Sequence, residues 1–125
     1  MIVMKRVYES VDPRDGYRVL VDRLWPRGVS KTAAKLDEWA KAISPSTELR
    51  QWYGHDPAKW EEFERRYAKE LENDAAQDTL DALARRGKRG RVTLLYSAKS
   101  GEISNAAALV RMLEARGSAR AASSR

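Results

Sequence analysis

Residues 17 to 28 constrain the fold of this chain more than any other stretch. Residues 17–24 form an apolar run rich in strand-forming side chains, and the Trp-Pro-Arg-Gly that follows ends it, because proline and glycine interrupt regular structure. We predict a central strand here. Asp22 and Arg23 fall inside it, where an unpaired charge is costly to bury and a paired one is tolerated. Their neighbours, Arg27 or a ligand must therefore satisfy these two charges.

Two further segments have the pattern of strands. Residues 2–8 alternate loosely between apolar and polar side chains. Residues 91–97 hold a short continuous apolar run of the kind found in buried parallel sheets. A turn at residues 12–16, Asp-Pro-Arg-Asp-Gly, joins the first strand to the central one. So short a connection favours an antiparallel hairpin, because a parallel crossover usually needs a dozen residues or more.

Apolar residues at helical spacing predict helices in the segments between these strands. Trp60, Phe63, Tyr67 and Leu71 recur at intervals of three and four, which predicts an amphipathic helix over 57–72. Asp56 and Pro57 supply its start signal, an acceptor at the N-cap and a proline in the first turn. Further helices are expected from Ser30 or Lys35 to Ala42, over 47–53, from Asp74 to a left-handed cap at Gly87, and from Ser104 or Asn105 to Gly117.

The length and composition favour one soluble domain. With 125 residues, the chain fits a single domain that buries most of the surface its unfolded form exposes. The absence of cysteine excludes a disulfide and agrees with the reducing cytoplasm. No apolar stretch approaches the roughly 20 residues that cross a bilayer, and basic residues come too early for a signal peptide. We therefore expect a cytoplasmic protein that does not enter a membrane.

The net charge of +6 is concentrated in two places. Five cations lie within residues 85–91, and Arg120 and Arg125 lie near the end, so the rest of the chain is close to neutral. Duplex binding needs cations spread over a face, and single-strand grooves interleave them with aromatic residues. Residues 85–91 contain no aromatic residue. We favour a solvated helix end, whose cations complement the helix dipole, without excluding nucleic acid as a partner.

Polar residues follow both the central strand and the last strand. In open α/β sheets, ligands bind outside the carboxyl ends of the strands, where helix N-termini offer unpaired amide donors. If the two strands are parallel neighbours, their polar ends share one crevice. The cations there would hold a phosphate or carboxylate, and Trp25 stands beside them at the strand end. The candidate ligand-binding residues are Arg23, Trp25, Arg27, Ser97, Lys99 and Asn105.

Asp22 and His55 are the candidate catalytic residues. Asp22 would be a base beside the anion site, although it is equally well explained as a structural partner of Arg23 or Arg27. His55 is the only histidine, which excludes a metal site built from several histidines. It lies in a loop between two predicted helices, where we favour a structural role over a catalytic one. We predict no metal and no cofactor, since there is no glycine-rich phosphate motif either.

Several unusual motifs together resemble the YeaO-like branch of the bacterial family called domain of unknown function 488. The resemblance covers residues 5–113, and the biochemical role of that family is not settled. It implies a small α/β domain with a mainly parallel sheet, in which residues 12–16 replace the crossover helix of longer relatives. The motifs are Tyr17 to Gly28 with Val29-Ser30, Leu36-Asp37-Glu38-Trp39, residues 44–50, residues 52–57, Trp60-Glu61-Glu62-Phe63 and Thr93-Leu94-Leu95-Tyr96.

The segment before the last helix departs from the family pattern. Where relatives have an acidic residue, a histidine and an asparagine, this chain has Glu102-Ile103-Ser104-Asn105. If that histidine transfers a proton in the relatives, this protein lacks the group. Either the position is not catalytic, or the activity here is altered.

The sequence and the resemblance together predict one small, three-layer-like α/β domain over residues 1–117. Its short, mainly parallel sheet has strands over 2–8, 17–24 and 91–97, flanked by helices, and residues 118–125 form a flexible tail. We expect this domain to bind a small anionic ligand. The alternative is a protein- or nucleic-acid-interaction module without catalytic activity, in which residues 85–91 meet the partner. Whether the protein is an enzyme stays open.

Overall fold

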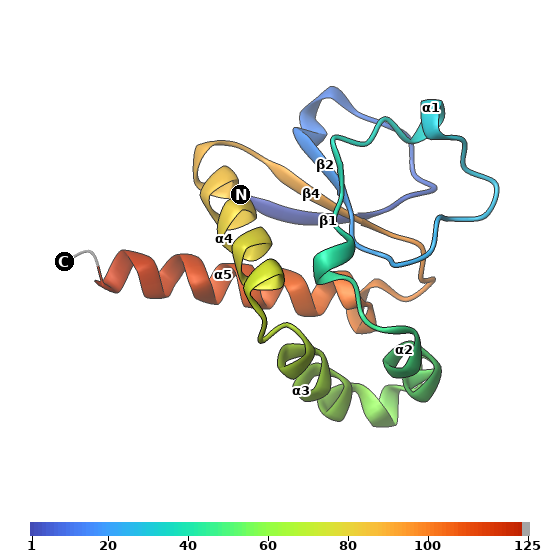
Figure 1. The fold of residues 1–125 in the computed structure, drawn as a ribbon. Helices are drawn as coiled ribbons and strands as arrows, with labels where there is room; N and C mark the ends of the chain where they lie inside the picture. The colour runs from blue at the N-terminus through green and yellow to red at the C-terminus, as the bar shows by residue number, and fades with distance from the viewer. Residues whose placement is uncertain (124–125) are drawn as a thin grey trace.

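Within residues 1–123, four parallel strands form one sheet in the order β1-β4-β2-β3. Figure 1 shows the fold as a computed structural model, which describes the backbone of residues 1–123 and the side chains of residues 1–116. The expected small α/β domain with a parallel sheet is confirmed. The strands are β1 (Ile2–Arg6), β2 (Tyr17–Leu20), β3 (Glu38–Trp39) and β4 (Val92–Tyr96).

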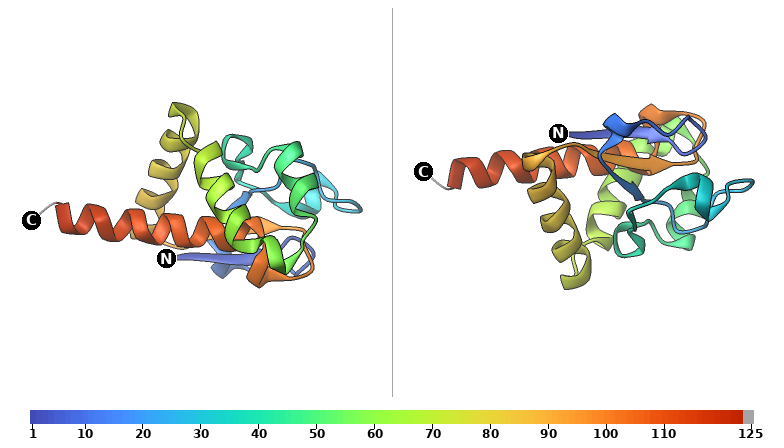
Figure 2. Two further views of the ribbon diagram at one scale, coloured as in Figure 1. Left: turned by 90° about the horizontal axis from the view of Figure 1, so that it is seen from below. Right: turned by 90° about the horizontal axis from the view of Figure 1, so that it is seen from above.

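The longer helices gather on one face of this sheet. They are α3 (Trp60–Glu70), α4 (Asp74–Arg89) and α5 (Asn105–Ser123), and α2 (Thr47–Tyr53) lies beside α3 (Figure 2). The helix expected over 47–53 is present as α2, and the helix expected over 57–72 is present as a 3-10 turn over 57–59 followed by α3, which ends at Glu70. Short elements complete the chain: 3-10 helix η1 (Pro13–Asp15), α1 (Lys31–Ala34), and 3-10 helices η2 (Lys41–Ile43), η3 (Pro57–Lys59) and η4 (Gly101–Ile103).

The connection from β1 to β2 is parallel although it contains no crossover helix. Its ten residues, 7–16, hold only η1. Ten extended residues reach about 33 Å, whereas the five residues of β1 rise only about 17 Å. The loop can therefore return to the start of the sheet and pass β4 to begin β2. The resemblance, rather than the usual loop-length rule, gave the correct strand direction.

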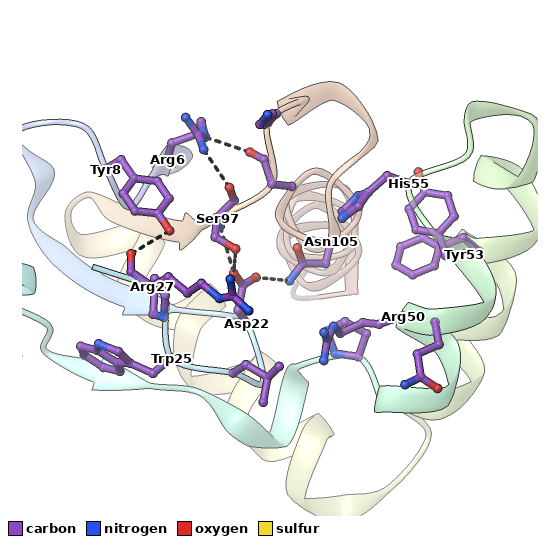
Figure 3. Close-up of a pocket in the computed structure, with 17 residues that line it drawn as sticks. Arg6, Tyr8, Asp22, Trp25, Arg27, Arg50, Tyr53, His55, Ser97 and Asn105 are labelled. Carbon is purple, nitrogen blue, oxygen red and sulfur yellow. Dashed lines mark hydrogen bonds between the residues drawn. The ribbon is translucent and has the colours of Figure 1, made fainter. Parts of the chain in front are cut away.

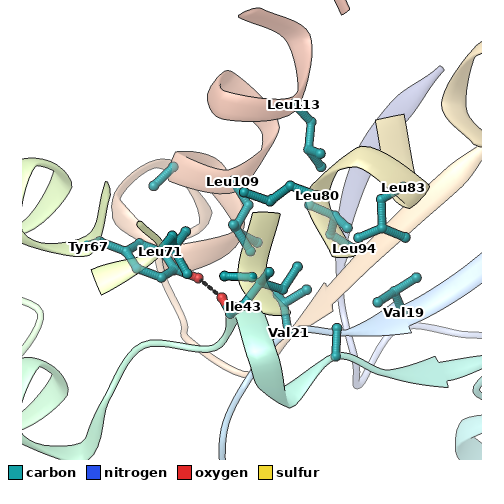
Figure 4. Close-up of a cluster of buried hydrophobic side chains, with 14 of the residues drawn as sticks. Val19, Val21, Ile43, Tyr67, Leu71, Leu80, Leu83, Leu94, Leu109 and Leu113 are labelled. Carbon is teal, nitrogen blue, oxygen red and sulfur yellow. Dashed lines mark hydrogen bonds between the residues drawn. The ribbon is translucent and has the colours of Figure 1, made fainter. Parts of the chain in front are cut away.

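The main core lies between the sheet and the helices. Side chains alternate along a strand, so Val19 of β2 and Leu94 of β4 reach the same face, where both are fully buried. They join Leu80 of α4 and Leu109 of α5 in one hydrophobic cluster (Figure 4). Tyr67 of α3 extends this cluster, and its buried hydroxyl donates a hydrogen bond to a main-chain carbonyl of η2. This packing fixes the helices against the sheet.

The opposite face of the sheet is covered by irregular segments instead of long helices. Leu20 and Leu95 are fully buried there, with Val7 beside them. Partly buried side chains from residues 25–39 pack on this smaller cluster. The loops that follow β2 are therefore held against the sheet by apolar contacts of their own.

A buried ion network lies on the same face. Arg18 of β2 is only 4% exposed, and its guanidinium donates hydrogen bonds to the Asp15 carboxylate and to the Ala34 carbonyl. Asp15 is 6% exposed and also accepts a hydrogen bond at 3.1 Å from Lys5 Nζ. The buried charges are thus paired with one another, as buried charges must be.

The helix expected up to Ala42 does not form. Instead, α1 ends at Ala34 because Lys35 adopts a left-handed conformation with φ 45°. The chain then extends into β3, where Trp39 pairs with Leu20 of β2, and η2 buries Ile43. The apolar residues at helical spacing therefore do not share one helix: Leu36 lies between α1 and β3, Trp39 lies in β3, and Ile43 lies in η2.

Two predicted helix ends are also wrong. α4 continues through Gly87 to Arg89, and a Cβ at Gly87 would lie 2.4 Å from Ile2 Cδ1, so this glycine allows close packing on β1. α5 continues past Gly117 to Ser123. The predicted flexible tail stays a prediction, and its last residues, 124–125, lie outside the described part of the chain. No helix within residues 1–123 has the length and apolar character needed to span a membrane.

We expect Gly16→Ala to lower the free energy of unfolding by about 2 kcal/mol or more. Gly16 has φ +66°, and an added Cβ would lie 2.2 Å from the carbonyl oxygen of Arg91. Gly28 is the matched control, since it has φ +75° but no atom within 4 Å of an added Cβ. Gly28→Ala should therefore lose only about 1 kcal/mol. Urea denaturation measures both values, and equal losses would contradict the steric argument.

Candidate functional site

A cleft of about 680 Å³ opens at the carboxyl ends of β2 and β4 (Figure 3). Because the two strands are parallel neighbours, the polar residues that follow them meet there, together with the first residue of α5. Arg23 is the one candidate site residue that does not line the cleft. The candidates that do are Asp22, Trp25, Arg27, His55, Ser97, Lys99 and Asn105.

Hydrogen bonds from neutral groups hold the Asp22 carboxylate at the floor of the cleft. Ser97 donates to Oδ2 from its main-chain nitrogen at 2.9 Å and from Oγ at 2.8 Å. Asn105 Nδ2 donates to Oδ1 at 3.1 Å and also to the Val21 carbonyl at 2.8 Å. Asp22 thereby ties the ends of β2 and β4 to the start of α5. Among the described side chains, Asp22 forms no ion pair.

The guanidinium of Arg23 donates its hydrogen bonds to main-chain carbonyls rather than to Asp22. Its Nε donates to the Pro45 carbonyl at 3.0 Å, and its Nη2 donates to the Ser44 carbonyl at 3.1 Å. β2 ends at Leu20, so Asp22 and Arg23 follow the strand instead of lying inside it, and both are half-buried. The predicted strand end at residue 24 was too late, and no buried ion pair is needed there.

Four cations and one carboxylate line the cleft, which gives it a positive formal charge. Arg6, at the end of β1, donates from Nε to the Ala98 carbonyl at 2.9 Å and from Nη2 to the Ser97 carbonyl at 3.0 Å. Arg27 and Lys99 are exposed. None of these cations forms an ion pair with a carboxylate of the described chain. Their charges are available to an anion.

Arg50 of α2 is the fourth cation in the cleft. Its Nη1 is the one buried side-chain nitrogen or oxygen among the described residues that has no hydrogen-bond partner. A buried donor left unsatisfied costs about 1 to 3 kcal/mol, and a charged one costs more. Arg50 thus lines the positive cleft and carries a buried guanidinium nitrogen that no described group satisfies.

The helix that carries Arg50 is fixed at both ends. The Ser46 hydroxyl caps its start by accepting a hydrogen bond from Leu49 N at 3.1 Å, as N-cap residues do. The Glu70 carboxylate of α3 accepts a hydrogen bond at 2.9 Å from the Ser46 main-chain nitrogen. Gly54 ends the helix in a left-handed conformation. Arg50 is therefore held in place by the backbone and not by partners of its own guanidinium.

Trp25 and His55 lie at opposite sides of the cleft (Figure 3). The Trp25 ring meets Trp39 edge to face with centroids 5.3 Å apart, and its Nε1 donates to the Val29 carbonyl at 2.6 Å. His55 is exposed and has φ 55°, directly after Gly54 with the same φ. Its ring centroid lies 5.8 Å from that of Tyr53. Trp25 is thus anchored, while His55 borders the solvent.

Ser104 has a structural role. It is completely buried, its Oγ donates to the Gly101 carbonyl at 2.8 Å, and the same oxygen accepts a hydrogen bond from Ala107 N at 3.2 Å. These contacts cap the start of α5. Within the described residues, no group of three or more histidine, cysteine, aspartate or glutamate side chains could hold a metal ion.

The basic segment 85–91 lies at the other end of the sheet. It ends α4 and leads into the amino end of β4, whereas the cleft is at the carboxyl end. The Arg86 guanidinium lies 3.8 Å from the centroid of the Tyr17 ring. No cation of this segment forms an ion pair with a described carboxylate. The segment and the cleft are therefore separate surfaces.

The sequence pattern did not single out Arg6, Tyr8 or Arg50, which also line the cleft. A signal existed for Arg6, because it ends the first strand just as Asp22 follows the second. No comparable signal existed for Arg50, since the side of α2 that faces the sheet depends on packing between distant segments.

Known proteins match this chain over most of its length. A family described as the inactive DUF488-N3 subclade matches residues 1–125. The chain is 46% identical over 99 residues to YeaO, an uncharacterized protein of Escherichia coli, covering 79% of this chain and 84% of YeaO. It is 43% identical over 111 residues to the uncharacterized protein Rv3073c of Mycobacterium tuberculosis, covering 89% and 92%. No solved structure matches the chain.

Proposed function

The chain belongs to the inactive DUF488-N3 subclade, and from that premise we propose that its cleft binds a small anionic ligand, bearing a phosphate or a carboxylate, without catalysing a reaction. The proposal is carried by Arg50, whose buried Nη1 has no partner among the described residues. Arg6, Arg27 and Lys99 line the same cleft. A guanidinium is the group best matched to phosphate and carboxylate oxygens.

Two observations support binding without catalysis. Asp22, the candidate base, already accepts hydrogen bonds from Ser97 and Asn105, which hold its carboxylate in a fixed structural position. Ser104 stands where the family resemblance leads us to expect a histidine, and it is buried as a helix cap. The description of the subclade as inactive agrees with the lack of a proton-transfer group there.

A thermal-shift titration with phosphate, sulfate and acetate tests the proposal. A ligand that binds only the folded state at 100 times its Kd stabilises that state by about 2.7 kcal/mol, which raises the melting temperature by several degrees. We expect Arg27→Ala to reduce this rise, because Arg27 lines the cleft. Arg85→Ala is the control, since Arg85 is an exposed cation at the other end of the sheet.

Failure of every anion in this panel to raise the melting temperature of the wild-type protein would overturn the proposal. A rise that Arg85→Ala abolishes and Arg27→Ala leaves intact would overturn it too. That second result would favour an interaction module that uses the basic segment 85–91, whose cations form no ion pair with the described carboxylates. Binding through that segment would weaken steeply with salt.

A further inference from the structure

The cleft is much larger than an inorganic anion requires. A water molecule takes up about 30 Å³ of the liquid, so a cleft of about 680 Å³ has room for an organic molecule. Its volume lies within the range of about 300 to 1,000 Å³ that is typical of small-molecule sites. The side chains that line the space beyond the anion therefore indicate the chemistry of the rest of the ligand.

Large apolar side chains are exposed at this cleft. Leu24 is 61% exposed and Tyr8 is 48% exposed, and both line the cleft. The other exposed large apolar side chains of the described chain, Met1 and Val11, do not line it. Exposed apolar groups gathered around a cavity mark a binding surface more often than single scattered ones do.

Tyr8 is also held in a fixed position. Its hydroxyl donates a hydrogen bond to the Arg27 carbonyl at 3.1 Å, and the Arg6 guanidinium lies 5.0 Å from the centroid of its ring. An aromatic ring that is half-exposed yet fixed loses little conformational freedom when a second ring stacks on it. The positive charge of Arg6 therefore lies beside the ring, while the hydrogen bond to the main chain of Arg27 fixes the hydroxyl end of the side chain (Figure 3).

We infer that the ligand of this cleft carries a planar ring next to its anionic group, and that this ring lies against Tyr8 and Leu24 while the anion meets the arginines. The inference rests on the proposed anion site and specifies the class of ligand. Aryl or heteroaryl phosphates and carboxylates belong to this class. Inorganic phosphate and acetate lack the part of the molecule that Tyr8 and Leu24 would contact.

Ligands that share the anionic group and differ only in the attached group test whether the cleft binds a planar ring. Calorimetric titration compares methyl, cyclohexyl and phenyl phosphate, with acetate, cyclohexanecarboxylate and benzoate as the carboxylate series. In the series that binds, we expect the phenyl compound to bind at least about ten times more tightly than the methyl compound. This ratio corresponds to stacking on one aromatic side chain. The cyclohexyl compound should fall between them, because it is apolar but not planar.

Four variants, one of them a control, test where the ring binds. Tyr8→Leu should remove most of the phenyl advantage, whereas Tyr8→Phe should keep it, because it retains the ring. Val11→Ala is the control, since Val11 is exposed but outside the cleft. If Tyr8→Leu does not fold, Leu24→Ser replaces it, because a side chain that is 61% exposed contributes little to the core. We expect Leu24→Ser to lower the phenyl advantage as well.

The possible failures of the two proposals are distinct. Equal affinity for the methyl and phenyl compounds, or for the cyclohexyl and phenyl compounds, would overturn the planar ring and leave the anion site standing. A phenyl advantage that survives both Tyr8→Leu and Leu24→Ser would overturn the placement of the ring. If no compound of either series binds, the proposed anion site fails and the inference fails with it.

Discussion

Asp15→Ala is expected to lower the free energy of unfolding by about 3 to 5 kcal/mol, because it leaves a buried guanidinium without its carboxylate. The Arg18 side chain is only 5% exposed and donates to Asp15. Lys5, whose side chain is 18% exposed, would lose the same partner. Taking one charge out of a buried pair costs more than the pair itself contributes.

Urea and thermal denaturation measure this loss, which corresponds to a fall of roughly 10 to 20 °C in melting temperature for a domain of this size. The double variant Asp15→Ala, Arg18→Met should recover part of it, because both buried charges are then gone. Glu62→Gln is the control, since Glu62 pairs with Arg65 and Arg66 on the exposed side of α3 and should lose only about 0 to 1 kcal/mol. If Asp15→Ala lost as little stability as this control, the buried ion network would not be a main source of stability on that face of the sheet.

The stability that this ion network contributes should also depend on pH. Burial acts to raise the pKa of Asp15, but hydrogen bonds from the Asp12 main-chain nitrogen and from the side chains of Lys5 and Arg18 outweigh it, so the pKa lies below its ordinary value. Stability from a carboxyl group with a lowered pKa is present above its unfolded pKa of about 3.9 and is lost as the pH falls further. The stability difference between wild type and Asp15→Ala should therefore shrink below about pH 4.

Arg50→Met should weaken anion binding by tenfold or more, while the protein without ligand keeps its stability or gains some. The two effects have one cause. The guanidinium has a buried nitrogen without a hydrogen-bond partner in the described chain, so removing it relieves a cost of about 1 to 3 kcal/mol in the free protein. The same change removes the guanidinium that would donate a charge-assisted hydrogen bond to the proposed anion.

Phosphate or carboxylate titration and urea denaturation of the same preparation measure both effects of Arg50→Met. Arg65→Met is the matched control, because Arg65 lies exposed on α3, outside the cleft, and pairs with Glu62. It should leave anion affinity unchanged. A marked loss of stability in Arg50→Met without ligand would show that the side chain has a structural role and would remove the main support for the anion site.

Local patterns predicted most of the architecture. The run at residues 92–96 is apolar on both faces because helices cover one side of β4 and irregular segments cover the other. The spacing of Phe63 and Tyr67 reports the one face of α3 that is buried. Such patterns are readable because burial repeats with the period of the element. The segment around Trp39 was misread because Leu36, Trp39 and Ile43 recur at helical spacing although they lie in a loop, a strand and a 3-10 helix.

Site residues that directly follow a strand could be predicted from the sequence. Site residues that belong to other elements could not. Ser97 and Lys99 follow β4, so the parallel sheet alone places them at the cleft. Arg50 reaches the cleft only through the packing of α2 on α3, and that packing involves residues as distant as Ser46 and Glu70. Arg23 was misplaced because β2 ends at Leu20, four residues before the predicted end at residue 24.

The position of β4 in the sheet also governs when the fold can be completed. Residue 92 pairs with residue 2 on one side and with residue 17 on the other, so both long ladders join early parts of the chain to a late one. β1 and β2 do not pair with each other, and β2 shares only two paired residues with β3. A nascent chain that has not yet reached Val92 contains both flanking strands without the strand that joins them. Folding through such distant pairings is intrinsically slow, and synthesis of β4 is the step that allows the sheet to close.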